Sequence, residues 1–157
     1  MTAMATGIYD WLLFLHIVSA MVWVGGAVLL GALAAIVLRE RDPDQVARFG
    51  ATLRMLGPRV LAPATIAVFG LGIWLVLDSA AWDFGQFWIE LALGLFGAAF
   101  LIGAAHQSRA ALELERAAER LDHETARRQL ARWTWGYAAI VVLLLAVAWD
   151  MVFKPGL

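Results

Sequence analysis

Four long apolar stretches, separated by arginine-rich segments, constrain this chain more than any other feature of its sequence. They cover about residues 11–38, 60–77, 84–106 and 133–152, and each is long enough to cross a bilayer as an α-helix. Backbone groups inside a bilayer must bond within their own segment, so each stretch is expected to be helical. The sequence therefore predicts an all-α, membrane-embedded, antiparallel four-helix bundle that forms a single domain over residues 1–157.

The arginines indicate how the bundle is oriented. Every arginine lies either in segment 39–59, between the first two spans, or in segment 109–132, between the last two. Loops on the cytoplasmic side of membrane proteins collect Lys and Arg. We therefore expect both arginine-rich segments inside and both termini outside, with the lipid bilayer as the main surrounding of the chain.

Composition excludes several classes of protein. Hydrophobic residues make up 62% of the chain, well above the share of about 45–50% that is typical of soluble domains. The basic segments also contain acidic residues and lie against a membrane, so nucleic acid is not an expected partner. The chain has no cysteine, which excludes disulfides, iron–sulfur clusters and thiolate metal sites.

The first arginine-rich segment is predicted to hold a short amphipathic helix. Asp42 suits the N-cap position and Pro43 suits the first helical position. Apolar residues then recur at helical spacing, and Gly57 with Pro58 is predicted to end the helix. We expect this helix to lie on the inner membrane surface or beneath the bundle.

The second arginine-rich segment is charged and strongly helical. We expect the third span to continue into the cytoplasm, the chain to turn near Asp122, and the fourth span to begin early, so that both spans have cytoplasmic helical extensions. Glu124 and Arg128 are spaced to form an ion pair across one helical turn. A solvated helical hairpin is the simple interpretation, and a docking site for a soluble partner is the alternative.

His16 in the first span and Glu90 in the third are the candidates for chemistry. Each lies a few residues inside the outer boundary, at a depth of about 6–9 Å. Ionisable side chains within a membrane are costly and mark functional sites. The two are therefore candidate metal ligands, or a His–carboxylate pair that relays a proton. The alternatives are a neutral His16 bonded to a neighbouring helix and a Glu90 at the lipid headgroups.

Three other polar residues receive simpler interpretations. Asp150 and Lys154, one helical turn apart near the outer end of the fourth span, are predicted to form an interfacial ion pair. His106 ends the third span near the inner boundary. It lies about 24 Å along the helix axis from Glu90, which is at the same depth as His16. A haem held by His16 could therefore not take His106 of the same chain as its second ligand.

The first span also carries a short motif. His16, Trp23, Gly25 and Gly26 form the pattern His-x6-Trp-x-Gly-Gly. It resembles the first-span motif of the bacterial copper-resistance D-like membrane proteins, and a similar His-x6-Trp occurs in the haem-b-binding membrane protoporphyrinogen oxidases. In layout, and in its C-terminal stretch 151–155, the chain is similar to a four-span bacterial family of unknown function within this broad group.

The resemblance implies a protein of the bacterial cytoplasmic (inner) membrane that binds haem b through His16, with Trp23, Gly25 and Gly26 beside the cofactor, as a redox or accessory protein. The third span lacks the functional lysine of the oxidases, so their reaction is not implied. The alternatives are a copper or proton transporter built on His16 and Glu90, and a purely structural accessory subunit. A second copy of the chain, or another membrane protein, is the expected protein partner, and no enzymatic reaction is assigned.

Overall fold

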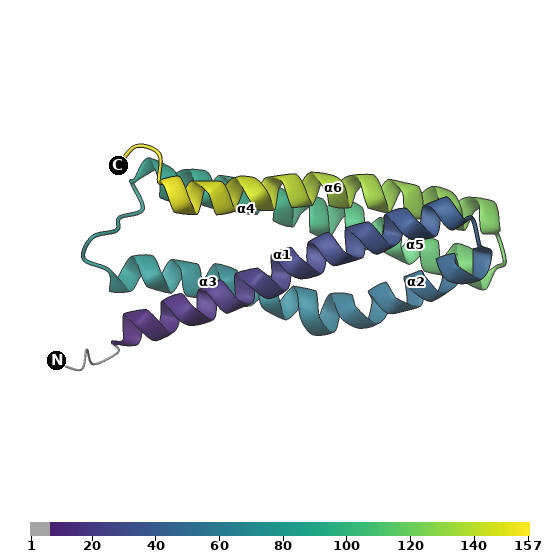
Figure 1. The fold of residues 1–157 in the computed structure, drawn as a ribbon, viewed down its shortest axis with the longest axis horizontal. Coiled ribbons are helices and arrows are strands. Elements are labelled where there is room, and N and C mark those ends of the chain that lie inside the picture. Colours follow the sequence, from purple (N-terminus) through teal and green to yellow (C-terminus); the bar gives the residue numbers. More distant parts are fainter. Residues whose placement is uncertain (1–6) are drawn as a thin grey trace.

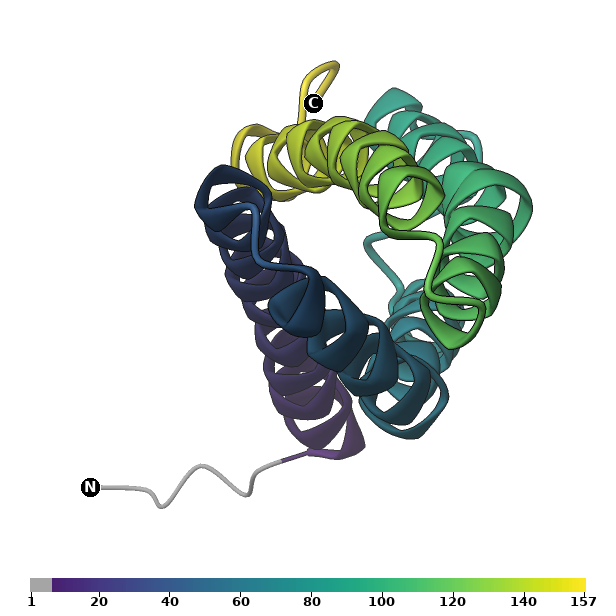
Figure 2. The ribbon, with the colours of Figure 1, turned by 90° about the vertical axis from the view of Figure 1, so that its right-hand side faces the viewer.

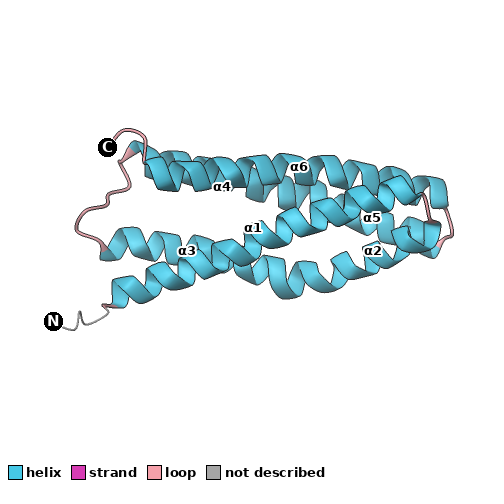
Figure 3. Cartoon of the chain, in the orientation of Figure 1, coloured by secondary structure: helices cyan, strands magenta, loops and turns pink. Residues whose placement is uncertain are grey.

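The computed structural model describes residues 7–157, and this part of the chain is helical without any strand (Figures 1 and 3). Two short π-helical segments, η1 and η2, join α-helices into longer continuous helices. The elements in chain order are α1 (Ile8–Glu40), α2 (Pro43–Leu56), η1 (Gly57–Leu61), α3 (Ala62–Asp78), α4 (Phe87–Leu101), η2 (Ile102–Gln107), α5 (Ser108–Glu119) and α6 (His123–Phe153).

Four continuous helices in the described residues are long and apolar enough to cross a membrane, which confirms the predicted fold class. Their bounds are Ile8–Glu40, Pro43–Asp78, Phe87–Glu119 and His123–Phe153. Only 11–22% of the residues in the most apolar window of each helix are buried inside the protein. So much outward-facing apolar surface needs a lipid environment, because soluble monomers rarely expose large apolar patches.

The helix of the first arginine-rich segment does not end at Gly57, as we predicted from the sequence. It continues through η1 into α3, and the Ala62 N–H donates to the Gly57 carbonyl, five residues back. Proline lacks an N–H, and its ring clashes with the carbonyl four residues earlier in a regular α-helix. The wider π turn relieves this conflict at Pro58, so the helix continues instead of breaking.

The helix α2 is continuous with α3 within the single helix Pro43–Asp78, so it extends one wall of the bundle and is not the separate helix on the membrane surface or beneath the bundle that we expected (Figure 1). Asp42 caps it, as predicted, by accepting a hydrogen bond of 2.9 Å from the Asp44 N–H. Its apolar face is buried against α5 and against the inner ends of α1 and α6. Phe49 makes an edge contact with Trp133, with ring centroids 5.5 Å apart.

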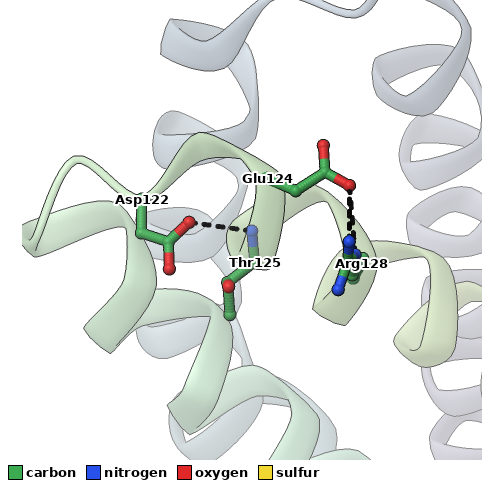
Figure 4. A network of polar contacts seen from close by, with 4 residues as sticks. All are labelled: Asp122, Glu124, Thr125 and Arg128. Atoms are coloured by element: carbon green, nitrogen blue, oxygen red, sulfur yellow. Dashed lines mark hydrogen bonds and ion pairs between the residues drawn. The ribbon is translucent and has the colours of Figure 1, made fainter.

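The helical hairpin of the second arginine-rich segment also follows the prediction. The third span extends through η2 and α5, the chain turns at residues 120–122, and α6 begins at His123. Asp122 caps α6 by accepting a hydrogen bond of 3.1 Å from the Thr125 N–H (Figure 4). Hydrogen bonding from Thr125 is the main cause that lowers the pKa of the Asp122 carboxyl. Glu124 and Arg128 form the predicted ion pair, at 3.0 Å.

The four spans are packed closely at the end of the bundle that carries the two arginine-rich segments, which we call the inner end. They separate toward the opposite end, which carries the described termini and which we call the outer end. Leu114 of α5 and Leu130 of α6 are the largest fully buried apolar side chains among the described residues, and both lie in the hairpin of the second arginine-rich segment. Toward the outer end α1 packs on α3 and α4 packs on α6. Within residues 7–157, α3 and α4 do not pack directly on each other. Figure 2 shows the bundle end-on, from the arginine-rich end.

Candidate functional site

A large cavity occupies the outer half of the bundle, where the two helix pairs separate. Its volume is about 870 Å³, and α1, α3, α4, α6 and the loop between α3 and α4 supply its walls. Nearly all the lining side chains are apolar or aromatic. Small-molecule and cofactor sites fall in this range of size and share this kind of lining.

His16 is the imidazole that α1 places in this cavity. Its Nδ1 is fully buried and has no hydrogen-bond partner, although the Val68 carbonyl lies nearby outside hydrogen-bonding geometry. The ring packs on α3 at Gly72, where a Cβ atom would lie 3.1 Å from His16 Cε1 and 3.5 Å from Nδ1. The other ring nitrogen, Nε2, does not belong to the atoms that are fully buried without a partner. It is therefore the ring nitrogen that a ligand could reach.

The other residues of the first-span motif divide between the cavity and a helix seam. Trp23 is buried and lines the cavity, and its ring lies 5.3 Å from that of Phe96. Gly25 also lines the cavity, with open space where a Cβ would stand. Gly26 instead faces Leu61, where a Cβ would lie 3.0 Å from the leucine Cδ2. The structure therefore brings three of the four motif residues to one cavity.

Glu90 is not brought to His16. It is exposed in the first turn of α4 and is not among the residues that line the cavity. The reason is local, because α4 begins at Phe87, later than the predicted start of the third span at residue 84. The inward positions of that turn are taken by Trp88 and Ile89, which are buried. The described residues also hold no group of three His, Asp or Glu side chains that could bind a metal.

The ion pair predicted between Asp150 and Lys154 does not form. Asp150 is fully buried in α6, and both its carboxylate oxygens lack a hydrogen-bond partner. Lys154 ends α6 in the left-handed conformation, with φ of 42°, and its backbone N–H donates to the Asp150 carbonyl at 2.8 Å. That backbone turn directs the lysine side chain away from Asp150, which lies in the preceding turn of the helix. The spacing in the sequence singled out both residues, but it did not show which way their side chains point.

Lys154 belongs instead to an aromatic group at the outer end of the cavity. Its Nζ lies 4.0 Å from the Trp82 ring centroid and 5.3 Å from that of Trp88. The Trp82 Nε1–H donates to the Tyr9 hydroxyl at 3.1 Å, which fixes the indole. All four residues line the cavity. Sequence reasoning did not predict this arrangement.

A second cavity, of about 580 Å³, lies in the inner half, and Trp23 lines both cavities. The π-helical turn of η2 places two consecutive side chains on α6. His106 Nε2 lies 3.3 Å from the Arg132 carbonyl, and Gln107 Nε2 donates to the Trp133 carbonyl at 3.0 Å. His106 is thus engaged at the inner end and does not line the outer cavity, in keeping with the separation expected from the sequence.

These features define an integral membrane protein with four spans and an apolar cavity in one half of the bundle. The family model described as "Predicted integral membrane protein (DUF2269)" matches residues 10–155, and the chain belongs to this family. Nothing among the curated proteins and nothing among the solved structures matches the chain.

Proposed function

We propose that this protein binds haem b in the outer cavity, where Nε2 of His16 would hold the iron. The orientation of the ring carries the proposal. Histidine ligands usually present one ring nitrogen to the metal while the other faces a carbonyl or carboxylate that orients the ring. Here Nδ1 is buried on the α3 side, 3.5 Å from where a Cβ of Gly72 would stand, the Val68 carbonyl of α3 lies near the ring, and Nε2 is the ring nitrogen that would be available to the iron. Haem proteins commonly hold the iron by one histidine in this way.

The residues of the cavity fit the cofactor in size and chemistry. A volume of about 870 Å³ lies within the range of small-molecule and cofactor sites, and the apolar walls suit an apolar macrocycle. Gly25 leaves open space beside it, and the aromatic rings of Trp23 and Phe96 lie in the wall. Met151, whose thioether is a weak soft donor, also lines the cavity.

The protein residues would orient the cofactor and keep water away from it. Bound haem b would supply one-electron redox chemistry, with its potential set by the axial ligand and by burial. This is the chemistry of a redox or accessory protein. The alternative of a copper or proton site on His16 and Glu90 gains no support, because Glu90 does not line the cavity.

We also propose that both termini are outside the bacterial cytoplasmic membrane. Both arginine-rich segments lie at one end of the bundle, where α2 packs on α5 (Figure 1). Arg54 of α2 and Glu115 of α5 form an ion pair of 3.1 Å there. The N-terminal end of α1 and the C-terminus lie at the opposite end. An arginine-rich end of this kind is expected in the cytoplasm.

Visible spectroscopy tests the haem proposal directly. Protein purified in mild detergent from haem-replete cells is expected to show a Soret band. His16→Ala should abolish the band. His106→Ala is the matched control, because it removes an imidazole that does not line the outer cavity, and it should leave the band unchanged. Wild-type protein that is colourless and takes up no added haem would overturn the proposal.

A further inference from the structure

Lys154 is a cation held at the outer end of the cavity without an acidic partner. It is the only lysine of the chain. The ion pairs among residues 7–157 join Arg54 to Glu115 and Arg128 to Glu124, and neither involves Lys154. The carboxylate of Asp150, one turn away, has no hydrogen-bond partner and therefore does not bond the ammonium group. The ammonium group of Lys154 is therefore available to pair with a group that does not belong to the described residues.

The backbone fixes where this charge lies. Lys154 adopts φ of 42°, a left-handed conformation that is uncommon for a residue with a side chain. The turn is closed by a hydrogen bond of 3.2 Å from the Leu157 N–H to the Lys154 carbonyl. Gly156, with φ of 90°, packs on Phe87 of α4, where a Cβ would lie 3.2 Å from the phenylalanine Cβ. Residues held in such conformations by their surroundings cluster at ligand sites.

The surroundings of the ammonium group leave its N–H donors available. The faces of Trp82 and Trp88 attract the charge without accepting strong hydrogen bonds. The rest of the cavity is almost wholly apolar, and His16 is its other basic side chain. A ligand that satisfies both features has an apolar body inside the cavity and an acidic group at its outer end.

We propose that Lys154 binds a carboxylate of the ligand in the outer cavity. This inference rests on the proposed function, in which the ligand is haem b and the carboxylates are its two propionates. The iron would then lie deeper, at His16, and the propionates would lie at the outer end beside Trp82. An ammonium–carboxylate contact at this position is a charge-assisted hydrogen bond, which is stronger than a neutral one.

Binding of porphyrins with and without free carboxylates tests the inference. Haem b, metal-free protoporphyrin IX and the dimethyl ester of each are titrated into the full-length protein in neutral detergent. Wild-type protein is expected to bind the free acids at least about tenfold more tightly than the esters. Lys154→Met should remove this preference and Lys154→Arg should retain it. Arg59→Met is the matched control, because it removes an exposed cation outside the cavity.

A second neutral variant guards against loss of the fold. Lys154→Asn also removes the charge, and asparagine tolerates the left-handed conformation of this position. Equal affinity of wild type and both neutral variants for the free acids would overturn the inference, even if His16 still gives a Soret band. A Lys154-dependent preference for metal-free protoporphyrin IX, without any His16-dependent Soret band, would support the inference and overturn the haem proposal. Failure to bind any of these porphyrins would overturn both.

Discussion

The imidazole of His16 packs directly on the backbone of Gly72 across the seam between α1 and α3. A Cβ at residue 72 would lie 3.1 Å from His16 Cε1, a distance at which the ring must shift. The glycine thus determines which edge of the ring is buried and which nitrogen remains for a ligand. This relationship gives the first of five predictions.

Gly72→Ala is expected to move the His16 ring away from α3 and to weaken haem affinity by about 10- to 100-fold, the usual effect of disturbing the support of a metal ligand. Haem titration followed at the Soret band measures it. Gly70→Ala is the control on the same helix, because a Cβ at residue 70 would meet nothing within 4 Å. Equal affinity of the two variants would show that the packing of Gly72 does not orient the ring.

Gly136→Ala is expected to destabilise the inner half of the bundle. A Cβ at residue 136 would lie 2.6 Å from His106 Cδ2 and 3.0 Å from Gln107 Nε2, so both side chains would leave their carbonyl partners on α6. The expected loss in the free energy of unfolding is about 1–3 kcal/mol. Thermal unfolding in detergent measures it, with Gly94→Ala, where a Cβ meets nothing within 4 Å, as the control. An unchanged midpoint for Gly136→Ala would contradict the packing described for η2.

Asp150→Asn is expected to raise the thermal stability of the protein. Both carboxylate oxygens are buried without a donor, and an unpaired buried charge is far more costly than an unpaired amide. The gain is expected to be on the order of 1 kcal/mol. Asp78→Asn provides the control, because Asp78 is exposed at the end of α3. A clear loss of stability in Asp150→Asn alone would mean that the carboxylate has a partner in the membrane.

The contribution of Asp122 to stability is expected to depend on pH. The pKa of this carboxyl is lowered in the folded protein, first by hydrogen bonding from Thr125 and further by the charges of Arg128 and His123. Its stabilising effect is therefore fully present above the unfolded pKa of about 3.9 and is lost as the pH falls through the folded value. Thermal midpoints of wild type and Asp122→Ala should differ near neutral pH and converge below about pH 4. A difference that stays constant down to pH 2 would contradict the assignment.

The orientation of the bundle can be tested by labelling, because the chain has no cysteine of its own. Single cysteines at Arg48 and Arg120, both exposed at the arginine-rich end, should react with an impermeant reagent only from the cytoplasm. A cysteine at Asp83, in the loop between α3 and α4, should react only from outside. Labelling of the Asp83 and Arg120 positions from the same side of intact cells would contradict the four-span topology.

The sequence by itself determined the class of fold, the four spans and the helical hairpin of the second arginine-rich segment. These features follow from local chemistry, because an apolar stretch of about 20 residues in a bilayer has little alternative to a helix. The cap at Asp42, the turn before His123 and the pair of Glu124 with Arg128 are equally local, and the structure confirms them. The sequence also singled out His16, because an imidazole within an apolar span is unusual, and the structure places it in the wall of the outer cavity.

Only the tertiary structure decided which side chains meet. A shift of three residues in the start of α4 leaves Glu90 outside the cavity, and spacing along the chain cannot resolve so small a shift. The left-handed turn at Lys154 separates it from Asp150 and places it over Trp82, because the direction of the backbone and not the interval of four residues governs the contact. The cavity itself exists because α3 and α4 do not pack together at the outer end, and that depends on all four spans at once.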